Sequence, residues 1–179
     1  MSRTSITGTT TQIRAWLVFF IVALVVSGLT AFPLETEIRI LSDVLHGLGF
    51  LPDAFTAWFD RIRDALIATN DDYPFLAYGT DWLAFAHLVI AVAFIGPLRD
   101  PVRNIWIIQF GMIACVGVIP LALIAGTVRG IPLGWQLIDM SFGVVGIIPL
   151  LIVYRLIKRL EQNQKLEASQ LPLDRHAAV

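Results

Sequence analysis

The chain has 179 residues, of which 56% are hydrophobic and 15% are charged, and its mean hydropathy is +0.74. The net charge of −1 gives no electrostatic footprint for a nucleic-acid partner. The single cysteine, Cys115, excludes an internal disulfide, a CxxC redox pair and a cysteine zinc site. These values exclude an ordinary soluble domain and predict an integral membrane protein.

Four long runs of the sequence contain almost no charge, and each is near the ~17–25 residues that a helix needs to cross a bilayer. The runs are apolar around the whole helix, as contact with lipid requires. We therefore predict an all-α integral membrane four-helix bundle that forms one domain, residues 1–179. The predicted spans cover about residues 15–32, 82–98, 105–128 and 135–157.

The first span ends at Phe32–Pro33, because proline does not continue a helix. A cleaved signal peptide is the alternative interpretation of this segment, with the small residues Ser27, Gly28 and Ala31 near the cleavage position. The run is long for the apolar region of a signal peptide, and the pattern of small residues fits cleavage poorly. We therefore expect a retained helix.

The segment 34–80 is too long for a simple turn between two spans. Apolar residues recur at helical spacing in residues 38–48 and again in residues 54–66, with charged residues between them. We predict an external loop built from two amphipathic helices, which either lie in the membrane interface or cap the bundle. Asp81 follows this loop and is expected either at the rim of a pocket or as the N-cap of the second span.

Short connections at residues 98–104 and 130–134 make the second, third and fourth spans antiparallel neighbours. Nine of the 13 Lys and Arg residues lie in the N-terminal segment, the connection at 98–104 and the C-terminal segment that begins at Arg155. Positive charge accumulates on the cytoplasmic side of membrane proteins. Both termini are therefore predicted to be cytoplasmic, and the expected location is the bacterial inner (plasma) membrane.

Ionisable residues inside a span are costly, which makes them candidates for a functional site. His87 in the second span and Asp139 in the fourth are expected at similar depth in the outer half of the bilayer, with Arg129 at the outer end of the third span. Gln136 and Asp139 share one stripe of the fourth helix with two glycines, so they are expected to face a neighbouring helix. The predicted ligand-binding residues of an outward-opening pocket between the second and fourth spans are His87, Asp139, Gln136, Arg129, Asp81 and Glu35.

A purely structural role for these residues is the alternative. Asp139 would then form an ion pair with Arg129 near the interface, or a hydrogen-bonded packing pair with His87. An acid–base role is also open, because Asp139 and His87 together would relay protons if burial tuned their titration.

Motifs for known chemistry are absent from the sequence. It has no P-loop, no dinucleotide-binding glycine pattern, no HExxH and no GxSxG. A second histidine for haem is missing from the spans. We therefore predict no catalytic residues and no cofactor. A metal site of His87, Asp139 and Asp81 has suitable ligand types but no local spacing, and it is left open.

The layout resembles the emopamil-binding (EXPERA) family of small four-helix membrane proteins. The likeness is carried by Trp106–Leu121 (WIIQFGMIACVGVIPL) and Gly146–Arg155 (GIIPLLIVYR), each with a proline inside a span. The resemblance implies a pocket for an amine or sterol-like ligand, with acids on the first two spans. In this sequence Glu35 stands near the end of the first span, and His87 stands where the family has an acid on the second.

We expect a non-enzymatic protein that binds a small apolar or amphipathic ligand. An accessory subunit of a membrane complex, a proton- or ion-translocating subunit and an isomerase-like enzyme are the alternatives. The expected partners are the lipid bilayer, the small ligand, and a second membrane protein or another copy of the chain.

Overall fold

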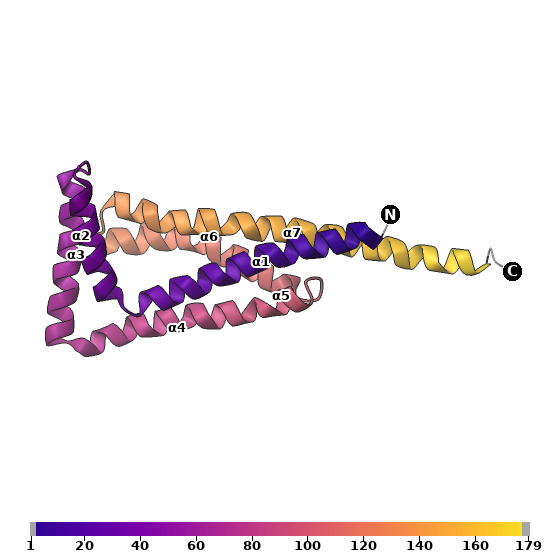
Figure 1. Cartoon of the computed structure of the whole chain (residues 1–179), viewed down its shortest axis with the longest axis horizontal. Coiled ribbons are helices and arrows are strands. Elements are labelled where there is room, and N and C mark those ends of the chain that lie inside the picture. Colours follow the sequence, from indigo (N-terminus) through magenta and orange to yellow (C-terminus); the bar gives the residue numbers. More distant parts are fainter. Residues whose placement is uncertain (1–2, 177–179) are drawn as a thin grey trace. The chain divides into compact units, whose positions relative to one another are not determined.

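The computed structural model describes residues 3–176 of the chain, with the side chains of residues 8–169 (Figure 1). The described chain is all-α: 90% of it is helical, and it contains no strand. Residues 1–2 and 177–179, at the ends predicted to be cytoplasmic, lie outside the described residues. The elements in chain order are α1 (Arg3–Ala31), α2 (Leu34–Leu48), α3 (Asp53–Asp72), the 3₁₀ helix η1 (Pro74–Leu76), α4 (Ala77–Ala93), α5 (Ile95–Arg99), α6 (Ile105–Val128) and α7 (Leu133–His176).

Four helical stretches in the described chain are long and apolar enough to cross a membrane, so the prediction of four apolar helices is confirmed. The fourth stretch continues further than predicted, into a charged segment. There Glu161 forms ion pairs of 3.0 Å with Lys158 and 2.8 Å with Lys165, and pairs at this spacing stabilise an exposed helix. The four stretches are Gly8–Ala31, Pro74–Arg99, Ile105–Val128 and Leu133–Ser169.

The second stretch is interrupted near its end. Helix α4 stops at Ala93 and α5 begins at Ile95. Pro97 explains the position of the break, because a proline cannot donate to the carbonyl four residues earlier and its ring crowds that carbonyl. The short helix α5 ends at Arg99, and the chain then turns into α6.

The expected N-cap role of Asp81 is wrong. Helix α4 begins at Ala77, four residues before Asp81, and follows directly on η1. Pro74 opens η1, where its fixed φ favours the start of a helix. The hydroxyl of Thr80 donates to the carbonyl of Ala77 at 2.7 Å, so Thr80 and Asp81 both lie inside the helix. The helix starts earlier than predicted because proline, not a polar cap, begins it.

The chain divides into two compact units. Unit 1 consists of Met1–Ile21 and Val92–Val179, and unit 2 of Val22–Ala91, so α1 and α4 contribute to both. The predicted organisation as one membrane domain stays a prediction. Phe94 is fully buried in the core of unit 1, and its ring lies 4.8 Å from that of the half-buried Phe20. The other buried apolar side chains of this core are Ile13, Leu17, Ile107, Ile108, Leu150, Val153, Ile157 and Leu160.

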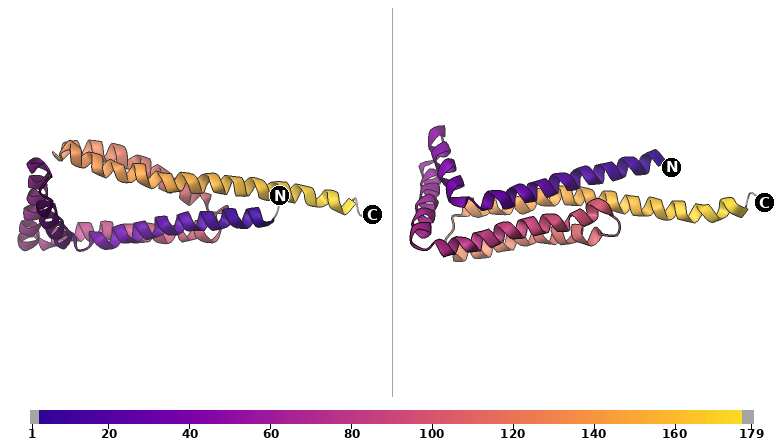
Figure 2. Two further views of the ribbon diagram at one scale, coloured as in Figure 1. Left: turned by 45° about the horizontal axis from the view of Figure 1, so that its top comes forward. Right: turned by 60° about the horizontal axis from the view of Figure 1, so that its bottom comes forward.

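In unit 1, α6 and α7 run antiparallel along each other (Figure 2). The turn between them includes Gly130, whose φ of +67° is a left-handed value that favours glycine. The helices approach so closely that a Cβ on Gly143 would meet the backbone carbonyl oxygen of Cys115. Gly146 faces the Sγ atom of the same cysteine. The small-residue stripe of the fourth span therefore packs on the third span.

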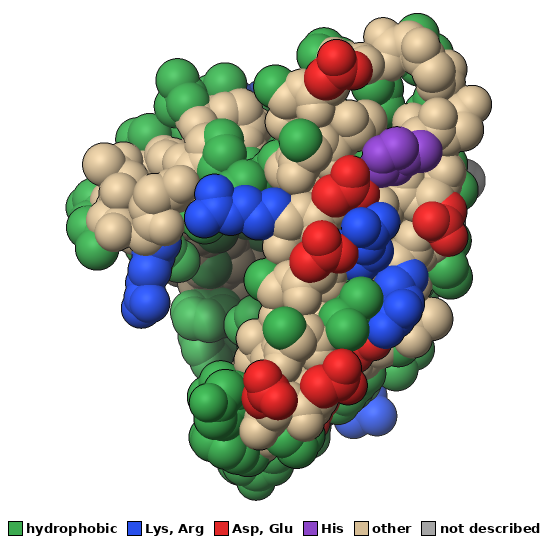
Figure 3. Space-filling view, turned by 90° about the vertical axis from the view of Figure 1, so that its left-hand side faces the viewer, with side chains coloured by type: hydrophobic (Ala, Val, Ile, Leu, Met, Phe, Trp, Pro, Cys, Tyr) green, Lys and Arg blue, Asp and Glu red, His purple; other side chains and the backbone are tan. Residues whose placement is uncertain are grey.

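In unit 2, α2 and α3 lie side by side and are joined by polar groups. The hydroxyl of Ser42, which is fully buried, donates to Oδ1 of Asp60 at 2.8 Å and accepts from Nη1 of Arg63 at 3.0 Å. Asp60 also lies 3.0 Å from Arg63 and 3.2 Å from Nε2 of His46. Acidic and basic side chains gather on the face over these two helices (Figure 3). These helices take the places predicted at residues 38–48 and 54–66, and both are longer.

Candidate functional site

Asp139 and Arg129 line one cavity of about 320 Å³ in unit 1. The cavity is formed by α6, by the first turns of α7 and by the turn between them. Asp139 is half-buried on α7, and Arg129 follows the last residue of α6. The remaining lining residues are apolar or glycine: Val118, Leu121, Ala122, Ala125, Gly126 and Ile131. The cavity therefore combines one carboxylate, one guanidinium and an apolar wall.

Gln136 holds the hairpin next to this cavity. Its side chain is 5% exposed, and its Nε2 donates to the carbonyl of Ile131 at 2.8 Å. Gly126 makes room for it, because a Cβ at that position would lie 2.7 Å from the side-chain carbons of Gln136. The amide thus satisfies a carbonyl in the turn, which is the usual requirement for a buried polar group. Gln136 and Asp139 face α6, as expected for one stripe of the helix.

The alternative of an Asp139–Arg129 ion pair is not observed. Among the residues that the structure describes, no ion pair or hydrogen bond joins these two side chains. Both line the same cavity without neutralising each other directly. A ligand with a charged or polar group would find both signs of charge there.

His87 belongs to unit 2, and its predicted pairing with Asp139 stays a prediction. Its Nδ1 lies 2.8 Å from the carbonyl oxygen of Leu83, one helical turn earlier on α4. The ring nitrogen would donate this bond in the tautomer that carries the proton on Nδ1. Packing against α1 is close here, because a Cβ on Gly28 would lie 3.1 Å from the Cβ of His87 and 2.9 Å from the carbonyl oxygen of Ala84. His87 therefore stands at a tight contact between α1 and α4.

Asp81 lies beside aromatic side chains on α4. It lines a shallow cavity of about 240 Å³ together with Phe32, Tyr78, Trp82 and Phe85. The rings of Tyr78 and Trp82 are 6.0 Å apart and nearly perpendicular, and those of Trp82 and Phe85 are arranged in the same way at 6.2 Å. The structure thus places Asp81 in an aromatic environment within unit 2.

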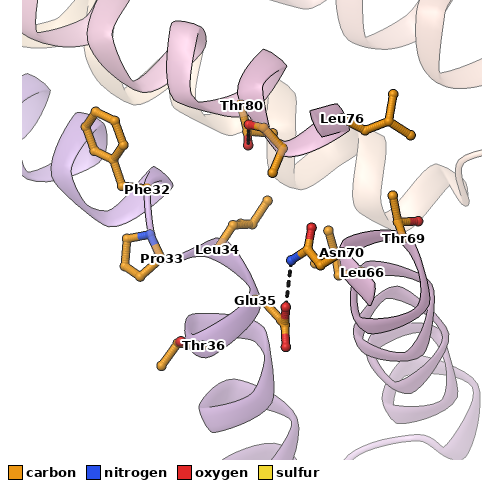
Figure 4. A pocket seen from close by; sticks show the side chains of 11 residues that line it. Phe32, Pro33, Leu34, Glu35, Thr36, Leu66, Thr69, Asn70, Leu76 and Thr80 are labelled. Carbon is orange, nitrogen blue, oxygen red and sulfur yellow. Dashed lines mark hydrogen bonds between the residues drawn. The ribbon is translucent and has the colours of Figure 1, made fainter. Parts of the chain in front are cut away.

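Glu35 lines a smaller cavity of about 170 Å³ in unit 2, where the connection between α1 and α2 meets α2, α3, η1 and α4 (Figure 4). Its Oε2 accepts a bond of 2.6 Å from the amide of Asn70, and its Oε1 accepts bonds of 2.7 and 3.0 Å from Arg39. The bond from Asn70, followed by the bonds and charge of Arg39, lowers the pKa of Glu35 below its ordinary value. Both carboxylate oxygens are therefore already engaged by the protein.

Two polar features are not among those predicted from the sequence. Asn70 is the first: it lies on α3, and its side-chain amide donates a hydrogen bond to Glu35 on α2. The cluster of Ser42, Asp60 and Arg63 was also not predicted. Its sequence signal was present: Ser42 lies among apolar residues of α2, and Asp60 and Arg63 are three residues apart on one side of α3.

The Arg129–Asp139 cavity offers two side chains of opposite charge and an apolar wall. Within the described residues, no group of three or more His, Cys, Asp or Glu side chains is arranged to hold a metal ion. Comparison with protein families, with curated proteins and with solved structures found no match for the chain. The resemblance to the emopamil-binding family therefore stays a similarity of layout.

Proposed function

We propose that the chain is an integral membrane protein that binds a small amphipathic ligand in the Arg129–Asp139 cavity. The single observation that carries this proposal is the position of two opposite charges on one largely apolar cavity within the α6–α7 hairpin. The volume of about 320 Å³ is at the lower end of the roughly 300–1,000 Å³ typical of small-molecule sites. Apolar walls would hold the body of the ligand, and the two charges would orient its polar group.

The membrane location supports this assignment. In water, Asp139 would be an unremarkable surface charge, but inside a candidate span its ionised form is costly and calls for a partner. In the proposed orientation both termini are cytoplasmic, and the turn at Gly130 is on the outer side of a bacterial inner membrane. The cavity would then open toward the outer leaflet, with α2 and α3 as amphipathic helices on the same side.

The cavity of Glu35 is a weaker candidate for the same role. It is about half as large, and both oxygens of Glu35 are occupied by Asn70 and Arg39. A ligand would have to replace charge-assisted hydrogen bonds that the protein already makes. The arrangement is that of a structural junction between helices.

Photocrosslinking tests the proposal directly. The full chain in phosphatidylcholine nanodiscs would be labelled with an alkyl-diazirine amine and, separately, with the matching carboxylate, and labelled peptides would be mapped by mass spectrometry. We expect labelling of residues 118–139. Asp139→Asn should reduce labelling by the amine about tenfold, and Arg129→Gln should reduce labelling by the carboxylate similarly, since each loses its charge partner.

Asp71→Asn is the matched control, because Asp71 is exposed on α3 and does not line this cavity. It should retain both labels. Equal labelling of the other apolar helices, unchanged by Asp139→Asn and Arg129→Gln, would show partition into lipid and would overturn the proposal.

An accessory role in a membrane complex is a second candidate, favoured by exposed apolar side chains on α2. Ile40 is 60% exposed and Val44 is 53% exposed on this helix, which is outside the four candidate spans. Such residues would contact the membrane surface, a partner protein or a second copy of the chain. Native purification in a mild detergent decides the matter: a stoichiometric second protein supports the accessory role, and a monomer or homo-oligomer argues against it.

A further inference from the structure

A second cavity of unit 1, of about 470 Å³, is lined by three arginines. Arg14 comes from α1, Arg99 is the last residue of α5, and Arg103 lies in the turn before α6. The α7 helix supplies Leu160 and Gln164 to the same cavity. Three parts of the chain that are far apart in the sequence, at residues 10–14, 99–103 and 160–164, therefore bring three guanidinium groups to one cavity.

The positive charge of this basic cavity is largely uncompensated. Asp100 is the acidic residue among those that line it, and its Oδ1 accepts the backbone N–H of Arg103 at 3.0 Å, which ties it to the turn. Within the described part of the chain, none of the three arginines forms an ion pair with a carboxylate. The three positive charges repel each other, and a bound anion would offset this unfavourable electrostatic energy.

The three arginines also border uncharged apolar runs. Arg14 lies within the candidate span Gly8–Ala31, directly before its uncharged run, and Arg99 ends the candidate span Pro74–Arg99. Arg103 is two residues before α6. In the membrane location proposed above, all three are at the depth of lipid headgroups in the cytoplasmic leaflet, where anionic lipids concentrate. Leu160, which is 3% exposed, adds an apolar wall.

We propose that this basic cavity binds the phosphate of an anionic phospholipid headgroup. A planar guanidinium can give two parallel hydrogen bonds to one phosphate, so three of them form a strong and oriented site. The side-chain amide of Gln164 would provide a further donor. A lipid is favoured over a soluble phosphate because the arginines stand at the membrane boundary beside exposed apolar side chains, such as Phe19 at 60%. The inference rests on the proposed membrane location but not on a ligand at Asp139.

Native mass spectrometry of the full chain tests this inference. The protein would be released from nanodiscs of phosphatidylcholine with 20% phosphatidylglycerol, and retained lipids would be counted. We expect one phosphatidylglycerol bound to the wild type. The double variant Arg99→Gln/Arg103→Gln should weaken its binding by about tenfold or more, since two of the three charges that attract the anionic headgroup are lost.

The matched control is Arg155→Gln/Arg159→Gln, which removes the same charge from exposed positions of α7 that do not line the cavity. It should retain the lipid. An equal loss in both double variants, or no loss in either, would overturn the proposal. Arg99→Lys/Arg103→Lys keeps the charge but not the paired donors, so it should bind with intermediate affinity even if the glutamine variant folds poorly. Its binding at full wild-type strength would contradict a guanidinium-specific site.

A second arm separates lipid from soluble anion. Thermal unfolding would be measured in nanodiscs of pure phosphatidylcholine, with and without 10 mM inorganic phosphate, and then with phosphatidylglycerol. Stabilisation by phosphatidylglycerol alone supports the lipid site. Equal stabilisation by inorganic phosphate would assign the cavity to a soluble phosphate and reject the lipid. A failure of the Asp139 labelling experiment would leave both results unchanged.

Discussion

Polar side chains in the apolar helices mostly find partners close by in the chain. Thr80 and His87 use carbonyls of α4 that are three and four residues earlier, and Gln136 uses the carbonyl of Ile131 in the turn before α7. Such local hydrogen bonds cost little conformational entropy, and they satisfy polar groups with which lipid cannot form hydrogen bonds. Asp139 differs, because in the described part of the chain its carboxylate meets a cavity and no hydrogen-bond donor. This difference is the basis of the binding role proposed for Asp139.

The hydrogen bonds of Glu35 predict how the thermal stability of the protein changes with pH. Its pKa is lowered in the folded protein by Asn70 and then by Arg39, so its stabilising contribution is complete above the ordinary pKa of glutamate. This contribution is lost as the pH falls through the lowered value. The melting temperature of Glu35→Gln should therefore be below that of the wild type at pH 7, and the two should converge in acid. Thermal unfolding from pH 7 to pH 3 measures this.

Glu37→Gln is the control for this prediction, because it removes the same charge from the same turn of α2. Its melting temperature should stay closer to that of the wild type at pH 7. A difference between wild type and Glu35→Gln that persists unchanged at pH 3 would show that the three hydrogen bonds to Glu35 do not depend on its ionisation.

At the scale of elements, glycines allow α6 and α7 to pack closely against each other. Gly111 lies under Phe94 and Leu150, where a Cβ would come within 2.8 and 2.9 Å of their side chains. Gly143 lies against the backbone of α6 at Cys115. In lipid there is no hydrophobic gain from pairing helices, so close packing at small residues supplies the attraction. The Arg129–Asp139 cavity depends on this pairing because both helices line it.

Gly143→Ala should destabilise the protein, by about 1–3 kcal/mol, because the added methyl meets a backbone carbonyl that cannot move alone. Gly117→Ala on α6 is the matched control. A Cβ there meets no atom within 4 Å, and alanine favours a helix by up to about 1 kcal/mol over glycine. The control should be neutral or slightly stabilising. Chemical unfolding in detergent measures both changes, and similar effects of the two variants would contradict the packing of α7 on α6.

At the scale of the whole molecule, the distribution of Lys and Arg predicts a topology. The basic cavity and the charged end of α7 are on the proposed cytoplasmic side, and the turn at Gly130 is on the other side. The two proposed sites would then serve opposite leaflets, an anionic lipid at one and an amphipathic ligand at the other.

Reporter fusions test this topology. Alkaline phosphatase, which is active only outside the bacterial cytoplasm, should be active when inserted at Gly49 or Gly130 and inactive at the C-terminus. Green fluorescent protein, which is fluorescent on the cytoplasmic side, should give the opposite pattern. Phosphatase activity at the C-terminus would show that the orientation is inverted.

The sequence alone determined the four apolar helices, because the length and composition of a run are local properties that decide whether a helix suits lipid. It also predicted that Gln136, Asp139 and Gly143 share a face, since helical phase follows from spacing. Helical phase does not say which neighbour that face meets. Only the tertiary structure decided that the stripe packs on α6, that Asp139 shares its cavity with Arg129, and that Glu35 is satisfied by Asn70, 35 residues away. These contacts join residues that are distant in the chain, so no local pattern carries them.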